Sequence, residues 1–173
     1  MKTKRSNRKS LIILFLALFL PLLLISFNLA HAQDRGMGLG VILGEPTGIS
    51  MKGWITKTQA VDGGLAWSFG KDESLQVHAD YLFHDFNLFK VEEGRLPIYF
   101  GIGGRFKLGD RDNVINNDNN HIGVRIPLGI DYLFSKYPVD IFLEVVPVMD
   151  LVPGTEFSFN AGIGARFFFE PSK

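Results

Sequence analysis

The chain has 173 residues, no cysteine, and equal numbers of basic and acidic side chains, 18 of each. The absence of cysteine excludes a disulfide framework and a lipid-modified N-terminal cysteine. The formal charge is zero for the whole chain and −5 for residues 33–173, which argues against nucleic acid as a partner and against electrostatic docking on anionic lipid.

The first 32 residues have the features of an export signal. A basic opening precedes a nearly unbroken apolar run, Leu11 to Leu24, and the small-residue pattern Ala-His-Ala follows at 30–32. This order is typical of a secretory signal peptide that is cleaved after the small residues. We therefore predict a signal peptide over residues 1–32. An uncleaved membrane anchor is the alternative, which Pro21 within the apolar run disfavours.

One alternating pattern repeats throughout the rest of the chain. Apolar side chains occupy every second position, and the positions between them hold mostly small, polar or charged residues, so each segment has two different faces. In chain order we predict eight strands: 36–44, 47–57, 60–69, 74–84, 96–108, 121–134, 138–150 and 157–169. Turn-forming residues separate them, and two connections are long, 85–95 and 109–120.

An even number of strands of about ten residues fits a barrel that crosses a bilayer. In hydrocarbon an open sheet edge would leave N–H and C=O groups unpaired, so the sheet must close. We predict an all-β fold, an eight-stranded antiparallel up-and-down transmembrane β-barrel, as a single outer-membrane domain over residues 33–173. The connection 85–95 would then lie at the end of the barrel that holds its two termini, on the periplasmic side.

Parity places the charged side chains on the inward face. It assigns five cations and six carboxylates there: Lys52, Arg105, Lys107, Arg125, Arg166, Asp62, Asp80, Asp131, Asp140, Glu144 and Asp150. His78, Gln76 and Asn160 share this face, as do six glycines: Gly101, Gly103, Gly123, Gly129, Gly162 and Gly164. Because charges removed from water need partners, we predict a salt-bridge plug rather than an open pore, with glycines making room for arginine heads.

The outward face carries aromatic rings near strand ends, as in the interfacial girdles of membrane barrels. They are Trp67, Phe69, Tyr81, Phe83, Tyr132, Phe134, Phe157, Phe167 and Phe169. High strand propensity of aromatic residues is the alternative explanation, which the clustering of the rings at the strand ends disfavours. Periodicity alone does not say which face is outside, and a soluble lipocalin-like barrel that binds a small ligand is the inverted alternative. The many glycines and the few, balanced charges of the polar face favour lipid outside.

Several segments resemble an uncharacterised family of small bacterial outer-membrane β-barrel proteins. They are 43–48, 65–69, 78–82, 97–105, 123–129 and 140–151. The chain is also similar in shape to the eight-stranded attachment and integrity barrels of Gram-negative bacteria. The resemblance implies the fold and the outer membrane, and it implies no activity and no site residues. The residues after Phe169 depart from the terminal aromatic on which such barrels often end.

Few residues indicate chemistry. His78, Asp80 and His84 share a strand face and could suggest a metal site, but a place in the lumen network, with His84 at the rim, is the simpler interpretation. The Asn-rich loop 110–120 lacks the ligand spacing of a calcium loop. No serine is visibly paired with a histidine base, Ser68, Ser74 and Ser158 being the nearest by face. We therefore expect no catalytic residues, no cofactor and no metal.

The sequence thus favours a small, plugged, porin-like barrel of the Gram-negative envelope with a structural or surface-contact role, not an enzyme. Its expected partners are outer-membrane lipid and, during biogenesis, the barrel-assembly machinery, with no nucleic acid, and the barrel is expected to be a monomer. A lipid-modifying enzyme of the outer membrane and a narrow channel remain the alternatives.

Overall fold

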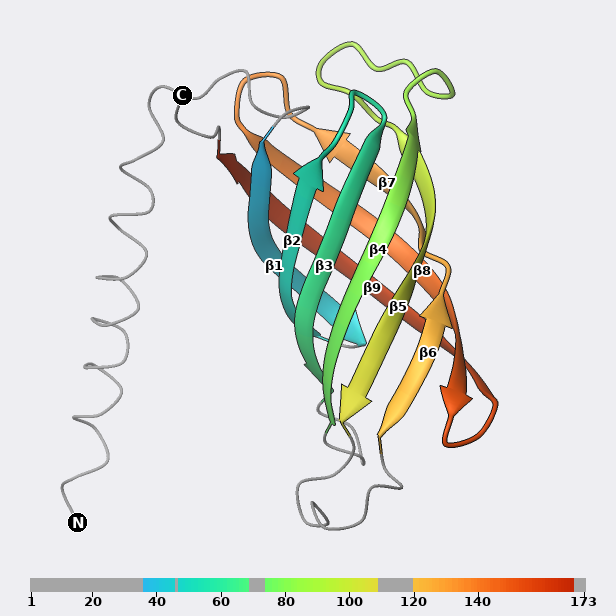
Figure 1. The fold of residues 1–173 in the computed structure, drawn as a ribbon. Coiled ribbons are helices and arrows are strands. Elements are labelled where there is room, and N and C mark those ends of the chain that lie inside the picture. Colours follow the sequence, from blue (N-terminus) through green and yellow to red (C-terminus); the bar gives the residue numbers. More distant parts are fainter. Residues whose placement is uncertain (1–35, 46, 69–73, 109–119, 170–173) are drawn as a thin grey trace, which may run out of the picture. The chain divides into compact units, whose positions relative to one another are not determined.

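The computed structural model describes residues 36–45, 47–68, 74–108 and 120–169, which form one antiparallel sheet (Figure 1). Its strands are β1 (Met37–Glu45), β2 (Thr47–Trp54), β3 (Gln59–Ser68), β4 (Ser74–Asp85), β5 (Ile98–Leu108), β6 (His121–Arg125), β7 (Leu128–Leu133), β8 (Val139–Val152) and β9 (Glu156–Phe169). The predicted signal peptide over 1–32 and most of the connection 109–120 lie outside the described residues. The signal peptide therefore stays a prediction.

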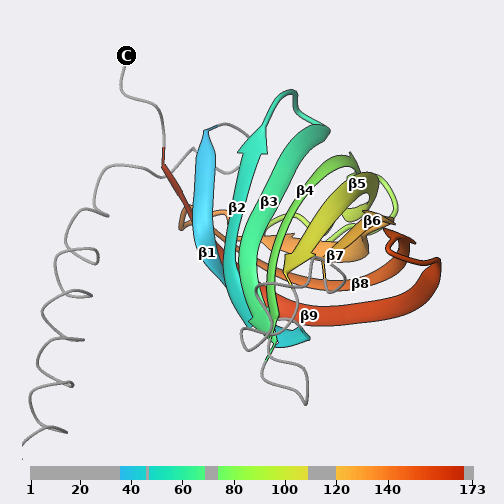
Figure 2. The same cartoon turned by 60° about the horizontal axis from the view of Figure 1, so that its bottom comes forward.

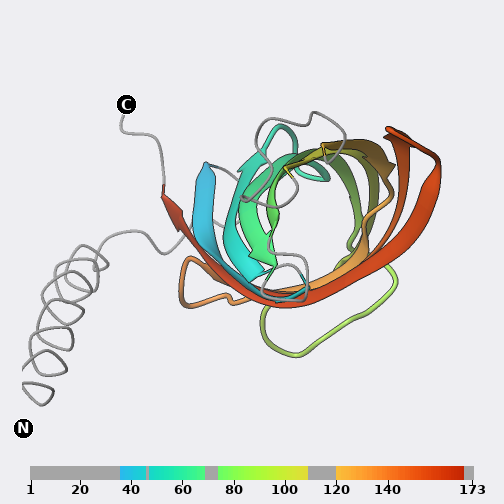
Figure 3. The ribbon, with the colours of Figure 1, turned by 90° about the horizontal axis from the view of Figure 1, so that it is seen from below.

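The sheet closes into a barrel through its first and last strands. β1 and β9 pair from Met37 opposite Phe169 to Glu45 opposite Ala161, and the other strands follow chain order around the ring. The ring of strands is visible in a tilted view (Figure 2) and in a view from below (Figure 3). The predicted all-β, up-and-down antiparallel barrel is confirmed. Among the described residues, no helix is long and apolar enough to cross a membrane.

One predicted strand, 121–134, is divided into β6 and β7. Both parts pair with β5 on one side and with β8 on the other, so they occupy a single place in the ring. The break falls at Pro127, which has no backbone N–H to donate to the ladder. Backbone pairing continues across the break, because Ile126 donates to the carbonyl of Pro147 at 3.0 Å and Pro127 accepts from Gly101 at 2.9 Å. The barrel therefore keeps eight positions around its axis.

The alternation of faces is maintained around the ring, with the apolar side chains outside. On β5, for example, Ile102 is 58% exposed, whereas Arg105 is buried. The described strands carry charged residues on their outward face only at strand ends, at Glu45 and Asp85. The inverted, lipocalin-like arrangement is therefore wrong, because the aliphatic face is outside the barrel and the charged face is inside.

The lumen is less polar than predicted. Large apolar side chains also point inward and are almost fully buried, among them Leu82, Leu133, Phe142 and Phe168. The predicted use of the glycines needs a correction as well. A Cβ at Gly103 would overlap Asp80 Oδ1, and one at Gly129 would overlap the ring of Tyr99. At these positions the space vacated by the missing Cβ is filled by a carboxylate and an aromatic ring, not by arginine heads.

The barrel has two unlike ends. We call the end with Met37 and Phe169 the terminal end and the opposite end, with the β1–β2 and β8–β9 connections, the distal end. The β4–β5 connection lies at the terminal end, as predicted (Figure 1). Hydrogen bonds attach it to β7: Arg95 and Leu133 exchange two backbone hydrogen bonds of 2.9 and 2.8 Å, and Tyr132 Oη donates to the carbonyl of Glu93 at 3.0 Å.

The predicted aromatic residues lie near the strand ends. Toward the terminal end four pairs of outward rings are in contact, Tyr81 with Phe83, Phe83 with Phe100, Tyr132 with Phe134 and Phe167 with Phe169. At the distal end Phe157 packs edge-on against Phe159, with 4.9 Å between the ring centroids. Phe69 lies outside the described residues. An interfacial girdle requires aromatic rings near both ends of the barrel, and this arrangement has them.

Candidate functional site

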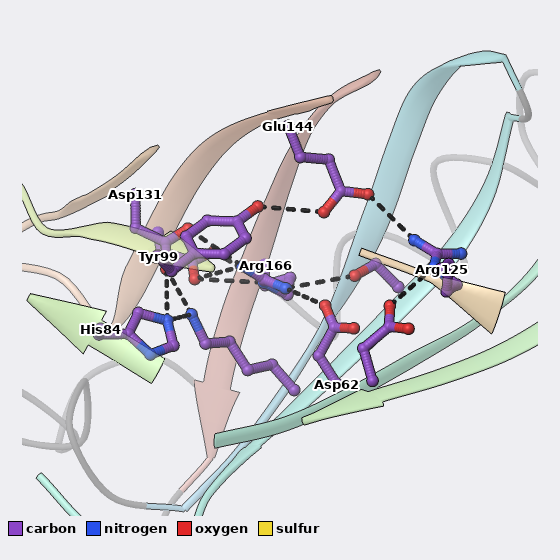
Figure 4. A network of polar contacts seen from close by, with 11 residues as sticks. Asp62, His84, Tyr99, Arg125, Asp131, Glu144 and Arg166 are labelled. Atoms are coloured by element: carbon purple, nitrogen blue, oxygen red, sulfur yellow. Dashed lines mark hydrogen bonds and ion pairs between the residues drawn. The ribbon is translucent and has the colours of Figure 1, made fainter. Parts of the chain in front are cut away.

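The inward-facing charges form three clusters along the lumen, and Figure 4 shows most of the two nearest the terminal end. The eleven charged residues predicted by parity are buried, except Lys107, which is half-buried. Each cluster combines side chains from several strands, since alternate residues of every strand point toward the same narrow space.

The first group, the terminal cluster, surrounds Asp131 on β7. Lys52 Nζ, from β2, donates to Asp131 Oδ2, and His84 Nε2, from β4, lies 3.3 Å from the same oxygen. Lys52 Nζ is also 2.8 Å from His84 Nε2 and 4.5 Å from the centroid of the Trp54 ring. His84, which we expected at the rim, is therefore buried within an ion-pair cluster.

Arg166 on β9 completes the terminal cluster. Its Nε donates to both oxygens of Asp140 at 3.1 Å, and its two terminal nitrogens lie 3.3 Å from Asp131 Oδ1 and 3.2 Å from Asp62 Oδ2. The guanidinium carbon is 4.0 Å from the centroid of the Phe142 ring. Because Asp62 is on β3, on the far side of the ring from β8 and β9, Arg166 joins opposite walls of the barrel (Figure 4).

The central cluster is built around Arg125 on β6. Its Nε lies 3.0 Å from Asp80 Oδ2, and one terminal nitrogen lies 3.6 Å from Glu144 Oε1. Tyr99 Oη donates to Glu144 Oε2 at 3.1 Å. A small cavity beside this cluster is lined in part by His78, Asn160 and Glu45. The volume that the centre of a water molecule can occupy in it is ≈ 10 Å³. That volume is about what one water needs.

The distal cluster is a bidentate pair. Arg105 on β5 donates to both oxygens of Asp150 on β8, at 2.9 and 2.6 Å. The same guanidinium donates to Ser158 Oγ at 3.2 Å and to Gln76 Oε1 at 3.5 Å. Ser158 therefore accepts from an arginine, a partner that does not serve as a base. The side chains of Ser68 and Ser74 lie outside the described residues.

The structure rearranges the trio His78, Asp80 and His84. His84 belongs to the terminal cluster, whereas one ligand atom each of His78, Asp80 and Asp62 lie within 4.8 Å of one another. Asp62 was predicted to be inward, but its place beside Asp80 was not. The signal that could have found it is the register of the hairpin formed by β3 and β4, in which Asp62 and Asp80 are direct partners. Tyr99 and Phe142, which contact the charged clusters, are also lumen residues that the sequence interpretation missed.

The fold and the lumen together define a small closed β-barrel with an apolar exterior and an ion-paired interior. The chain belongs to the family described as protein of unknown function, DUF3996, whose sequence model matches residues 29–171. The predicted membership of an uncharacterised barrel family is thereby confirmed. No curated protein matches the sequence.

Two solved structures are similar to this barrel. The N-terminal β-barrel domain of Pseudomonas aeruginosa OprF has 16% sequence identity and a TM-score of 0.58, over 77% of this chain and 95% of that chain. Neisserial surface protein A (NspA) has 14% identity and a TM-score of 0.50, over 77% of this chain and 93% of that chain. At these identities the likeness establishes a shared fold.

Proposed function

We propose that this protein is an outer-membrane barrel with a structural role in the envelope or in surface contact, exported by a signal peptide cleaved after residue 32. The observation that carries the proposal is the distribution of charge. The middle of every described strand presents uncharged side chains outward, while Arg125 and Arg166 are each 2% exposed inside. Burying arginines and exposing aliphatic side chains is favourable when the surroundings are hydrocarbon and unfavourable when they are water.

The positions of the rings and loops support a membrane location. Aromatic pairs lie near both ends of the apolar band, where the polar headgroups of a bilayer would begin. In the outer membrane the terminal end would face the periplasm and the distal end the exterior. The barrels of OprF and NspA share the fold, and the second is named as a surface protein.

The lumen network supports a plugged barrel. Arg166 spans the lumen between β3 and β8, and Phe142 packs against its guanidinium. These contacts across the lumen support a barrel without a continuous column of water for ion flow. A structural role is favoured over lipid modification because Ser158, the described candidate nucleophile, is held by Arg105.

Fractionation and electrophoresis test the location and the closure of the barrel. The protein should be in the outer-membrane fraction, and unheated samples should migrate differently from boiled ones. Recovery of monodisperse protein in buffer without detergent would refute the membrane proposal.

Conductance and lipid analysis test the role. In planar bilayers the purified protein should give no steady current, and regular open-channel steps would refute the plug. A strain lacking the protein should become sensitive to detergents with an unchanged profile of envelope lipids. A changed profile, reversed by the wild-type protein and not by a Ser158→Ala variant, would support the enzyme instead.

A further inference from the structure

Two buried carboxylates face each other directly across the hairpin formed by β3 and β4. Asp62 and Asp80 are register partners, and they are 7% and 3% exposed. Like charges at directly opposite positions destabilise an antiparallel pair, and burial away from water increases the cost. Each carboxylate has one arginine contact, Asp62 with Arg166 at 3.2 Å and Asp80 with Arg125 at 3.0 Å. A further cation, or a proton shared between the two carboxylates, would lower the remaining cost of the pair.

The charge balance of the lumen leaves a surplus of carboxylates in the clusters that contain this pair. Among the described residues the buried ionic groups are four cations and six carboxylates, if histidines are counted as neutral. Lys52 and Arg166 offset Asp131 and Asp140 in the terminal cluster, and Arg105 offsets Asp150 in the distal cluster. Arg166 also contacts Asp62, so the two clusters nearest the terminal end must be counted together. They hold three cations, Lys52, Arg125 and Arg166, against five carboxylates, Asp62, Asp80, Asp131, Asp140 and Glu144. A divalent cation would make the two clusters together neutral.

Two of the three residues at this point, Asp80 and His78, have polar atoms without a hydrogen-bond partner among the described residues. Neither oxygen of Asp80 accepts a hydrogen bond from the described residues, because the Nε–H of Arg125 does not point at the oxygen that lies 3.0 Å away. Nδ1 of His78 is buried without a hydrogen-bond partner. His78 lies two residues from Asp80 on β4, so both side chains point into the lumen from the same strand.

We propose that Asp62, His78 and Asp80 bind one divalent metal ion of the zinc type inside the barrel. One imidazole and two carboxylates are a ligand set that Zn²⁺ accepts, and three protein ligands leave a fourth position for water. The ligand atoms are within 4.8 Å of one another, so small side-chain movements bring all three to a common ion. Gly103 permits the arrangement, because a Cβ there would overlap Asp80 Oδ1.

The cavity beside the central cluster supplies a place for the water that would complete the coordination of the ion. His78 lines it, and so does Glu45, which is exposed at the distal end of β1. The cavity therefore lies between the imidazole and the distal end of β1. Arg125 stays compatible with the bound ion, because two carboxylates balance the ion and Glu144 remains for the guanidinium.

The test is metal binding by the full protein, purified in detergent and stripped with a chelator. Equilibrium dialysis against Zn²⁺ should give one ion per chain, and Zn²⁺ should raise the temperature at which heat-modifiable mobility is lost. His78→Gln and Asp80→Asn should abolish the bound ion and the thermal shift. His84→Gln is the matched control, because it removes a buried histidine of the same strand that lies in the terminal cluster, and it should keep both.

Co²⁺ provides a reading on the wild-type protein that does not depend on the folding of a variant. Bound at this site it should give visible absorption bands typical of four-coordinate nitrogen and oxygen ligands, and these bands should disappear when Zn²⁺ is added. Wild-type protein that binds no stoichiometric Zn²⁺ would overturn the proposal and leave a proton shared by Asp62 and Asp80. Binding that survives His78→Gln but is lost in His121→Gln would also overturn it, in favour of the distal group of His121, Asp150 and Glu156.

Discussion

Removal of the Arg166 guanidinium is the sharpest test of the lumen network. In Arg166→Ala, Asp131 keeps Lys52 and His84 as partners, but Asp140 loses both of its hydrogen bonds from Nε. Asp140 is fully buried, so its charge would be stranded away from water. Breaking a buried ion pair from one side costs about 3–5 kcal/mol. Loss of the packing against Phe142 adds to this, so we expect a value near the upper limit.

The assay is urea unfolding of the barrel reconstituted in lipid vesicles, followed by tryptophan fluorescence. Trp54 is a suitable reporter, because its ring lies beside Lys52 in the terminal cluster. Lys136→Ala is the control: its ion pair with Glu93 has both side chains 70% exposed, and such a pair contributes at most about 1 kcal/mol.

A double variant separates the stranded charge from other losses. If the cost of Arg166→Ala comes mainly from the unpaired carboxylate, adding Asp140→Asn should recover about 1–3 kcal/mol of the lost stability. The reasoning is refuted if Arg166→Ala unfolds at the same urea concentration as Lys136→Ala. It is also refuted if the double variant loses stability by the simple sum of the two single losses, since the two side chains would then not interact.

Two further variants test the outward face and the packing of the lumen. Ile102→Arg should cost about 2–4 kcal/mol when the barrel is unfolded from a bilayer, because this side chain projects from the middle of β5 into the proposed hydrocarbon; an unchanged unfolding midpoint would mean that the position faces water. Gly103→Ala should cost about 1–3 kcal/mol, because its Cβ meets Asp80 and the β4 backbone, whereas Gly104→Ala points outward, meets nothing closer than 3.7 Å and should be near neutral. Equal urea midpoints for the two alanine variants would contradict the assigned faces.

Much of the fold could be predicted because its signal is local. The pleat of a strand has a period of two, so alternation in the sequence is enough to separate the inward from the outward set. Arg125, Arg166 and Asp131 were placed inside on this basis, and all three are buried. The cause of the break between β6 and β7 is also local. Pro127 lies within the predicted strand 121–134, and a proline interrupts a ladder because it has no N–H.

Part of the candidate site could also have been derived. Folding the predicted hairpin 60–69 and 74–84 about its turn brings Asp62 opposite Asp80 within one step of register, and the parity of the inward face removes the uncertainty. The alternative grouping of His78 with His84 relied on a shared strand alone. The structure separates them, because His84 lies near the end of β4 and contacts Lys52 and Asp131.

The sequence by itself determined the strand segments, apart from the break at Pro127, and the two faces of each strand, since these follow from local alternation. Closure of the sheet was expected because a barrel in lipid must satisfy every backbone group. Only the tertiary structure decided which charges meet. Arg166 reaches Asp62 across the lumen, 104 residues away in the chain, because the stagger of the closed ring brings the two side chains to the same level. That stagger depends on all the strand registers together, and no single segment of the sequence specifies it.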